Sequence, residues 1–320
     1  MIERLPNDAD LHALVEDFFR VSFATDNPLI TEAVRRMLAA GGKRLRPRLT
    51  LLAAEAVGGD ARDHLALAAY MELIHVATLI HDDVVDQAET RRGVNSTAVD
   101  FGNRVSVLAG DYLFAWIFKN VTASYDRPIP HILSATLAAI CDGEVLQLRA
   151  LGNLALTTDQ YVEIVQKKTA SLFAASAECG AHVNKANAMR VAALQDFGNS
   201  FGIAFQMRDD LLDMTADAAA LGKPVGNDLR EHKVTLPLIL ALEGAGSHFR
   251  AQVERFYAEE DATKESIAAV VAGIRAAGGL AGTRKHIADY AKRAIAALAP
   301  LGAVAARTQL ATLAESLTKE

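Results

Sequence analysis

The chain has 320 residues, of which 51% are hydrophobic and 22% are charged, so it is not a disordered protein and can bury a large core. Acidic residues outnumber basic residues by 39 to 33, which argues against a broad basic surface for nucleic acid. We therefore expect no nucleic-acid partner, and an anionic substrate would be held by local clusters of Lys and Arg.

Apolar residues recur with helical spacing along nearly the whole chain, and the alternation typical of strands is almost absent. We expect helices over 9–21, 28–40, 46–57, 62–87, 94–100, 103–124, 129–150, 158–180, 187–214, 233–243, 247–259, 264–276, 280–298 and 303–318. Turn-forming residues separate these stretches, and no linker divides them. The pattern predicts an all-α fold, a single large bundle of long helices that forms one domain over residues 1–320.

The sequence also bears on location. The most apolar stretch, 65–80, contains Glu72 and His75 and is shorter than the ~20 residues that a membrane-spanning helix needs. The first ten residues are polar and lack the pattern of a secretory signal. We therefore expect no integral membrane segment and a cytoplasmic location.

Two acidic motifs of the form Asp-Asp-x-x-Asp, at 82–86 and 209–213, end long apolar helices. The first and last aspartate of each motif lie one turn apart on one helix face, where they repel each other and oppose the helix dipole. Such carboxylates favour a cation, and hard oxygen ligands completed by substrate phosphates indicate Mg²⁺. The candidate metal ligands are Asp82, Asp83, Asp86, Asp209, Asp210 and Asp213. The alternative is that these acids are simply solvated at two helix ends.

Basic residues accompany both motifs. Lys43, Arg44, Arg46 and Arg48 follow two glycines at a predicted helix start, where backbone N–H groups favour anions and Arg side chains match phosphate oxygens. Further basic residues, near the acidic motifs or on the predicted helix 158–180, are Arg91, Arg92, Lys167, Lys168, Lys223 and Lys233. Any one of these groups could be a solvated charge run, but together they indicate a phosphorylated substrate.

Several segments resemble those of the trans-type isoprenyl diphosphate synthases, or polyprenyl synthetases, and they occur in the same order. They are GGKRLRPRL, ELIHVATLIHDDVVD, RRG, GDYLF, KTASLF, FGIAFQMRDDLLD, GKPVGNDL and KVTLPLI. The resemblance runs from about residue 28 to residue 242 and is closest to the medium- and long-chain, octaprenyl-type synthases. One departure is His232, because the family usually has Gly before the lysine found here at 233.

The resemblance implies an isoprenoid synthase-like bundle around a central apolar cavity and a homodimer. It implies that isopentenyl diphosphate is condensed with an allylic diphosphate in the trans configuration, with typically three Mg²⁺ ions per site. Asp82, Asp86, Asp209 and Lys168 would be catalytic, with Asp83, Asp210 and Asp213 supporting the metals. The allylic substrate would be held by Arg91, Lys168, Thr169, Gln206, Lys223 and Lys233. Isopentenyl diphosphate would be held by Lys43, Arg46, His75 and Arg92.

The growing product needs an apolar tunnel, and the helix that carries Asp82 is its natural wall. Ala77 and Thr78 lie ~6–7 Å below Asp82 and are small, whereas short-chain bacterial relatives have a bulky aromatic residue in this region. We therefore expect a deeper tunnel, with Leu133 as its floor, and a product in the C30 to C50 range used for quinone side chains. The alternative is that Ala77 and Thr78 are ordinary small core residues.

Three other functions remain open. A short-chain farnesyl or geranylgeranyl diphosphate synthase would have the same motifs. A class I terpene cyclase also ionises a diphosphate, but it lacks the DDLLD form of the second motif and has no use for the segment GGKRLRP. A partner subunit of a heteromeric synthase would be expected to lose aspartates or substrate lysines, and this chain keeps them.

Overall fold

The computed structural model describes residues 8–319 except 24, 92, 216–225, 245 and 260–261. Contacts within the chain divide it into two compact units. Unit 1 consists of Met1–Ser134, Ala175–Gln195 and Pro300–Arg307, and unit 2 consists of Ala135–Ala174, Asp196–Ala299 and Thr308–Glu320. The expected single domain over 1–320 stays a prediction.

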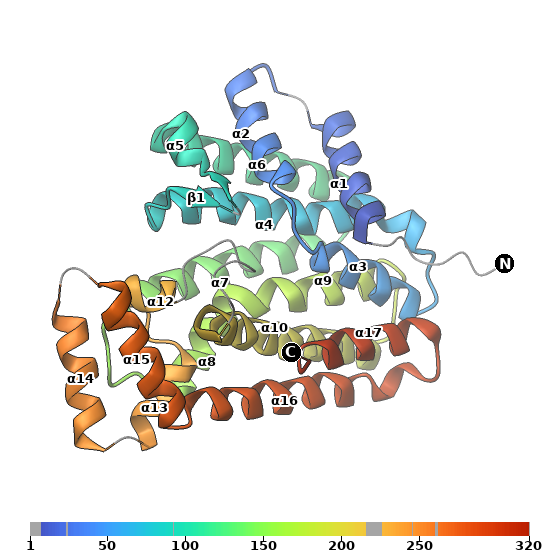
Figure 1. The fold of residues 1–320 in the computed structure, drawn as a ribbon. Helices are drawn as coiled ribbons and strands as arrows, with labels where there is room; N and C mark the ends of the chain where they lie inside the picture. Colours follow the sequence, from blue (N-terminus) through green and yellow to red (C-terminus); the bar gives the residue numbers. More distant parts are fainter. Residues whose placement is uncertain are drawn as a thin grey trace. The chain divides into compact units, whose positions relative to one another are not determined.

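Unit 1 is built around one helix, α4 (Leu65–Val85). It packs against α1 (Asp8–Ser22), α2 (Pro28–Ala39), α3 (Leu45–Ala56) and α6 (Asn103–Ser124), as Figure 1 shows. Apolar residues surround α4 on nearly all sides, and such a helix is stable only inside a bundle. The other elements of this unit are η1 (Ala61–His64), β1 (Thr90–Arg91), β2 (Val94–Asn95) and α5 (Thr97–Phe101).

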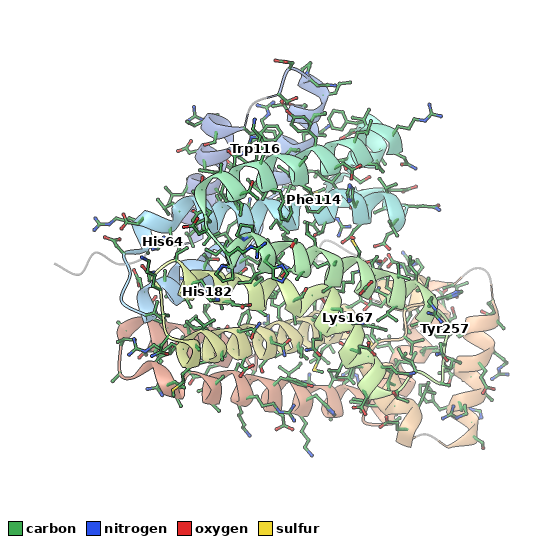
Figure 2. All side chains as sticks on the ribbon, turned by 180° about the vertical axis from the view of Figure 1, so that it is seen from behind. His64, Phe114, Trp116, Lys167, His182 and Tyr257 are labelled. Carbon is green, nitrogen blue, oxygen red and sulfur yellow. The ribbon has the colours of Figure 1, made fainter. Side chains whose placement is uncertain are left out.

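An aromatic cluster fixes α1 and α6 on α4. Trp116 of α6 is largely buried and makes edge contacts with Phe18, Phe23 and Tyr70 at ring-centroid distances between 5.2 and 6.4 Å. Figure 2 shows Trp116 on its helix. Edge-to-face pairs of this kind add packing energy beyond the area that they bury, so these rings hold the N-terminal helix on the unit.

Unit 2 is helical throughout the part that the structure describes. Helix α13 (Leu236–Gly244) packs against α8 (Thr158–Val165), α15 (Lys264–Ala276) and α16 (Gly279–Ala297). Further elements are a π-helical turn, η2 (Gln166–Ala170), and the helices α12 (Asn227–Arg230) and α14 (Ser247–Ala258). The elements α7 (Ile129–Ala150), α9 (Ser171–His182), α10 (Ala188–Thr215), η3 (Ala299–Leu301) and α17 (Ala305–Ser316) have residues in both units.

The all-α class is confirmed, and most helix ends fall within two residues of the predicted ones. One prediction was wrong. The segment 94–100 begins with a strand, because Gly93 has a φ of 81° and turns the chain into the two-residue hairpin β1–β2 before α5. The segment 158–180 is helical throughout as predicted, but it contains the π-helical turn Gln166–Ala170 between α8 and α9.

By length and composition, two described helical stretches, 61–85 and 129–150, could cross a membrane, or three if the bent pair 264–276 and 279–301 counts as one span. The lengths of these helices therefore do not exclude a membrane-spanning segment. In the first stretch, 61% of the most apolar window is buried inside the protein, so its apolar side chains serve the core of unit 1.

Candidate active site

The first acidic motif lies where α4 ends. The Asp86 N–H donates to the Asp82 carbonyl oxygen at 2.8 Å, so the last turn of the helix is regular. The side chains of Asp82 and Asp86 are half-buried and lie one turn apart, on one face. Asp83 points to a different face and its side chain is fully buried. The motif therefore separates into two carboxylates on one face and one inside the protein.

The buried carboxylate of Asp83 binds Arg91. The Arg91 Nε and Nη2 atoms lie 2.7 and 2.6 Å from Asp83 Oδ1, and Arg91 is brought there by the strand β1. Burial raises the pKa of Asp83, and the Arg91 guanidinium opposes this shift. The pair holds Arg91 beside the acidic motif, which favours a supporting role for Asp83 over direct metal ligation. The neighbouring Arg92 lies outside the described residues.

The four cations of 43–48 have different environments. Lys43 is exposed and Arg46 is half-buried, but Arg44 is 2% exposed. Its Nη1 donates to Glu72 Oε1 at 2.7 Å, and its Nη2 donates to the Leu38 carbonyl oxygen at 2.8 Å. The expectation that Arg44 joins an anion-binding cluster was wrong, because its guanidinium is used inside the protein.

The buried pair of Arg44 and Glu72 connects two predicted substrate-binding residues. Glu72 lies on α4 three residues before His75, which is half-buried. Arg44 directly follows Lys43 in the loop before α3. The ion pair thus fixes the loop of Lys43 to the helix of His75 within unit 1, although the individual roles of these residues stay predictions.

The three predicted chain-length residues differ in burial. Ala77 and Leu133 are fully buried. Thr78 is half-buried, and its Oγ1 donates to the His75 carbonyl oxygen at 2.8 Å. The chain-length role of all three stays a prediction.

The second acidic motif ends α10 in unit 2, and its three aspartates again differ. Asp209 is exposed, Asp213 is half-buried and Asp210 is 5% exposed. Both oxygens of Asp210 accept hydrogen bonds, Oδ2 from the Tyr161 hydroxyl at 2.5 Å and Oδ1 from Gln206 Nε2 at 2.8 Å. Burial raises the pKa of Asp210 to about 7, and these two hydrogen bonds oppose the shift.

Asp213 binds the start of the short helix α12. Its two carboxylate oxygens accept from the backbone N–H groups of Asn227 and Asp228 at 3.2 and 3.1 Å, at the start of the short helix α12. An acidic side chain at this position also satisfies N–H groups that lack partners within the helix. Burial raises the pKa of Asp228 well above its ordinary value, and the neighbouring Asp210 and Asp213 raise it further. Asp228 was not predicted, although it stands in the segment GKPVGNDL.

Lys168 and Thr169 lie on the π-helical turn η2. Turns of this kind are rare in proteins, and those that occur are often found at functional sites. The Lys168 ammonium lies 2.5 Å from Glu144 Oε2, and Thr169 Oγ1 donates to Gln206 Oε1 at 3.0 Å. A Cβ atom on Gly143 would lie 2.4 Å from the Lys168 backbone nitrogen, so only glycine lets α7 approach this turn so closely. Glu144 is a partner that the sequence did not reveal.

Lys233 follows a residue in the left-handed conformation. His232 has a φ of 54°, which explains why the family favours glycine there. The His232 ring packs on Tyr257 of α14 at a centroid distance of 5.3 Å, and the Tyr257 hydroxyl donates to the Lys233 carbonyl oxygen at 3.2 Å. Tyr257 is labelled in Figure 2. The Lys233 ammonium lies 2.6 Å from Glu231. Lys223, the other predicted lysine of this region, lies outside the described residues.

Among the described residues, no group of three or more His, Cys, Asp or Glu side chains could hold a metal ion. The donors in the motifs are nevertheless carboxylate oxygens, the type that Mg²⁺ prefers. A Mg²⁺ ion at Asp82 and Asp86, or at Asp209, would therefore need oxygens from substrate or water to complete its ligands. Proteins usually bind Mg²⁺ in this way in sites that handle phosphates.

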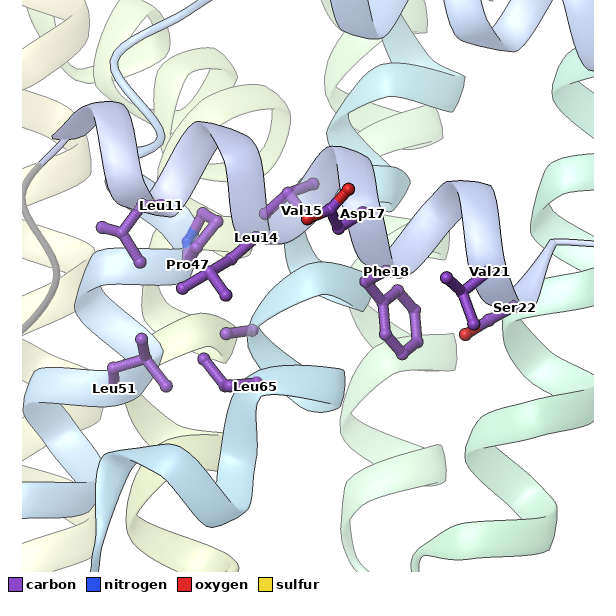
Figure 3. Close-up of a pocket in the computed structure, with 11 residues that line it drawn as sticks. Leu11, Leu14, Val15, Asp17, Phe18, Val21, Ser22, Pro47, Leu51 and Leu65 are labelled. Atoms are coloured by element: carbon purple, nitrogen blue, oxygen red, sulfur yellow. The ribbon is translucent and has the colours of Figure 1, made fainter.

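Figure 3 shows an apolar cavity in unit 1, which has a volume of about 300 Å³. Leu11 and Phe18 of α1, Leu51 of α3 and Leu65 of α4 are among the residues that line it. Ala77, Thr78 and Leu133 are not among them, so this cavity is not the predicted product tunnel.

Comparisons with known proteins agree with the resemblance found in the sequence. The polyprenyl synthetase family model matches residues 27–274. Octaprenyl diphosphate synthase of Escherichia coli (strain K12) is 39% identical over 274 residues, which cover 86% of this chain and 84% of that protein. Short-chain isoprenyl and geranylgeranyl diphosphate synthases also match, so similarity alone does not determine the product length.

Solved structures agree as well. A decaprenyl diphosphate synthase from Rhodobacter capsulatus has a TM-score of 0.90 and 40% identity, covering 97% of this chain and 96% of that one. A polyprenyl synthase from Caulobacter crescentus CB15, complexed with calcium and isoprenyl diphosphate, has a TM-score of 0.90 and 38% identity over 98% of this chain and 94% of that one.

Proposed function

The chain belongs to the polyprenyl synthetase family and is a trans-prenyltransferase, and we propose that it condenses isopentenyl diphosphate with an allylic diphosphate to give a medium- or long-chain polyprenyl diphosphate. One observation carries the proposal. Each of the two acidic motifs lies at the end of a helix, and each has basic side chains held in place within its own unit. Arg91 is held by Asp83 beside the first motif. Lys168 is held by Glu144 in unit 2, which also contains the second motif.

We propose Mg²⁺ as the cofactor, typically three ions as the family resemblance implies. Asp82, Asp86 and Asp209 are the ligands that we assign to it, since their carboxylates are exposed or half-buried. Bound Mg²⁺ would neutralise charge on the diphosphate group and thereby favour its departure from the allylic carbon as pyrophosphate. The calcium complex of the Caulobacter crescentus protein supports the use of a divalent metal.

The basic side chains hold the two substrates. We assign Arg91, Lys168 and Lys233 to the allylic diphosphate, and Lys43, Arg46 and His75 to isopentenyl diphosphate. Arg91, Lys168 and Lys233 are each paired with a carboxylate, of Asp83, Glu144 and Glu231 respectively. These pairs restrict the long side chains before substrate arrives, which lowers the entropy lost on binding. Arg92 and Lys223 complete the two sets by resemblance.

The product length that we propose is C30 to C50, the range of quinone side chains. Its support is the small size of Ala77 and Thr78 on α4, together with the octaprenyl and decaprenyl relatives. A short-chain product is the alternative, favoured by the geranylgeranyl diphosphate synthases among the relatives.

We also propose a cytoplasmic homodimer. The homodimer is supported by exposed apolar residues on the surface of α6. Val107, Leu108 and Tyr112 are exposed at 39%, 60% and 36%. Leu108 and Tyr112 lie four positions apart and therefore share one side of the helix, and Val107 directly precedes Leu108. Large apolar side chains exposed together on one helix face are typical of surfaces that bind another protein chain.

The decisive experiment is incubation of the purified chain with Mg²⁺, labelled isopentenyl diphosphate and a short allylic diphosphate. We expect labelled polyprenyl diphosphate, no product with a chelator, and recovery when Mg²⁺ is restored. The substitutions Asp82→Ala and Asp209→Ala should each lower the rate by orders of magnitude while the helical circular dichroism spectrum is unchanged. The matched controls are Asp63→Ala and Asp289→Ala, which remove exposed aspartates away from both motifs. Near-normal turnover in either motif variant would contradict the proposed metal ligands.

A further inference from the structure

A buried tyrosine anchors the second acidic motif. Tyr161 of α8 is 4% exposed, and its hydroxyl donates to Asp210 Oδ2 at 2.5 Å. Burial and the charge of Asp210 raise the pKa of Tyr161 well above 10, so the phenol keeps its proton and acts as a donor. Tyr161 lies one turn and a half before the π-helical turn that carries Lys168 and Thr169, so it ties this part of the chain to α10.

The carboxylate of Asp210 sets the direction of a chain of hydrogen bonds. Gln206 presents its NH₂ group to Asp210, with Nε2 donating to Oδ1 at 2.8 Å. The Gln206 carbonyl oxygen then faces Thr169 and accepts its hydroxyl proton at 3.0 Å. The order of the chain is therefore Thr169 to Gln206 to Asp210, with Tyr161 donating to the same carboxylate from the other side.

With both oxygens of its carboxylate occupied and 5% of its surface exposed, Asp210 is better suited to this chain than to a metal. Buried polar groups are costly when one partner is lost, so each member of such a chain restricts the next. The backbone of the turn is held separately, by the close approach of Gly143 to Lys168. Backbone and side chains of the turn thus have independent supports.

We propose that Tyr161 is a positioning residue of the allylic site, which acts through Asp210 to fix the Gln206 amide and so to aim the Thr169 hydroxyl. The inference rests on the proposed roles of Thr169 and Gln206 in holding the allylic substrate. It assigns Asp210 to this hydrogen-bonded chain and leaves metal ligation in the second motif to Asp209.

The substitution Tyr161→Phe removes the hydroxyl and keeps the ring. We expect the KM for the allylic diphosphate to rise about tenfold, the loss that follows from removing one buried hydrogen bond to a charged group, while the KM for isopentenyl diphosphate stays within twofold. Calorimetry with geranyl thiodiphosphate, an allylic analogue that ionises slowly, should show a similar weakening without turnover. The control is Tyr290→Phe on α16, where the tyrosine ring packs against Arg293. An unchanged allylic KM in folded Tyr161→Phe would overturn the proposal.

A second variant keeps the proposal testable if Tyr161→Phe folds poorly. Asp210→Asn keeps the shape of the side chain but weakens the acceptor, so the allylic KM should rise while the Mg²⁺ concentration for half-maximal activity stays within twofold. A large increase in that concentration would show Asp210 to be a metal ligand and would overturn the assignment.

The variant Gln206→Ala distinguishes a failure of the proposed allylic site from a failure of the proposed role of Tyr161. If it leaves the allylic KM unchanged, the proposed allylic site is wrong. If it raises the allylic KM and Tyr161→Phe does not, the allylic site stands and the positioning role of Tyr161 is wrong. A rise in both variants supports both proposals.

Discussion

The Arg44 guanidinium donates a 2.7 Å hydrogen bond to the Glu72 carboxylate, and both side chains are buried, at 1% and 3% exposure. The pair joins the loop that carries Lys43 to the helix that carries His75, so two residues proposed to bind the same substrate are connected by a contact that excludes water. A buried charge without its partner is strongly destabilising.

The first prediction therefore concerns stability. Arg44→Met should lower the free energy of unfolding by about 3–5 kcal/mol, because it leaves the Glu72 carboxylate buried without its cation. The double variant Arg44→Met with Glu72→Leu should recover part of this loss, since it removes both charges. Chemical unfolding followed by circular dichroism measures the difference. The control is Arg35→Met, which breaks an exposed ion pair with Glu32 and should cost less than about 1 kcal/mol. Equal stability of Arg44→Met and the control would contradict a structural role for the buried pair.

The second prediction separates the two substrates. Lys43→Ala should raise the KM for isopentenyl diphosphate roughly tenfold with little effect on the allylic KM, because each lysine is proposed to bind one diphosphate. Lys168→Ala should do the opposite. Initial rates with one substrate varied at a time measure both constants, and Lys285→Ala on the exposed side of α16 is the control. Equal effects on both constants in both variants would show that the basic residues do not divide into two sites.

The third prediction concerns product length. Ala77→Phe should shorten the product sharply while the first condensation stays active, because an aromatic ring one turn below Asp82 would close the proposed tunnel. Ala77 is fully buried, so the larger side chain could also destabilise the helix by about 1–3 kcal/mol. Thr78→Phe, at a half-buried position, provides a second test with less overpacking. Chromatography against chain-length standards measures the products. A wild-type product of C15 or C20, or a long product unchanged in both variants, would refute this explanation of length control.

The fourth prediction concerns His232, which has a φ of 54° and packs on Tyr257. His232→Ala loses the ring contact and keeps the left-handed strain, whereas His232→Gly loses the contact and relieves the strain. The glycine variant should therefore be more stable than the alanine variant by about 1–2 kcal/mol. Thermal unfolding of both variants measures the difference, and a glycine variant no more stable than the alanine one would mean that the backbone there is not strained.

The sequence alone determined the fold class, the positions of most helices and the two acidic motifs. These features depend on local periodicity and on spacing within a few residues, which a single helix expresses by itself. The helices 103–124, 129–150 and 264–276 have the predicted bounds, and Asp82 and Asp86 lie one turn apart as expected. The hairpin at 90–95 and the π-helical turn were missed, because two-residue strands and a single wide turn leave no periodic pattern.

The tertiary structure alone decided which member of each motif is buried and which is accessible. Adjacent residues of the same charge, such as Asp209 and Asp210 or Lys43 and Arg44, look equivalent in sequence, but they point to different faces and meet different neighbours. Asp210 meets Tyr161, which is 49 positions away, and Arg44 meets Glu72, which is 28 positions away. Such partners are separated by intervening helices, and only the packing of those helices brings a buried donor and a buried acceptor within hydrogen-bonding distance.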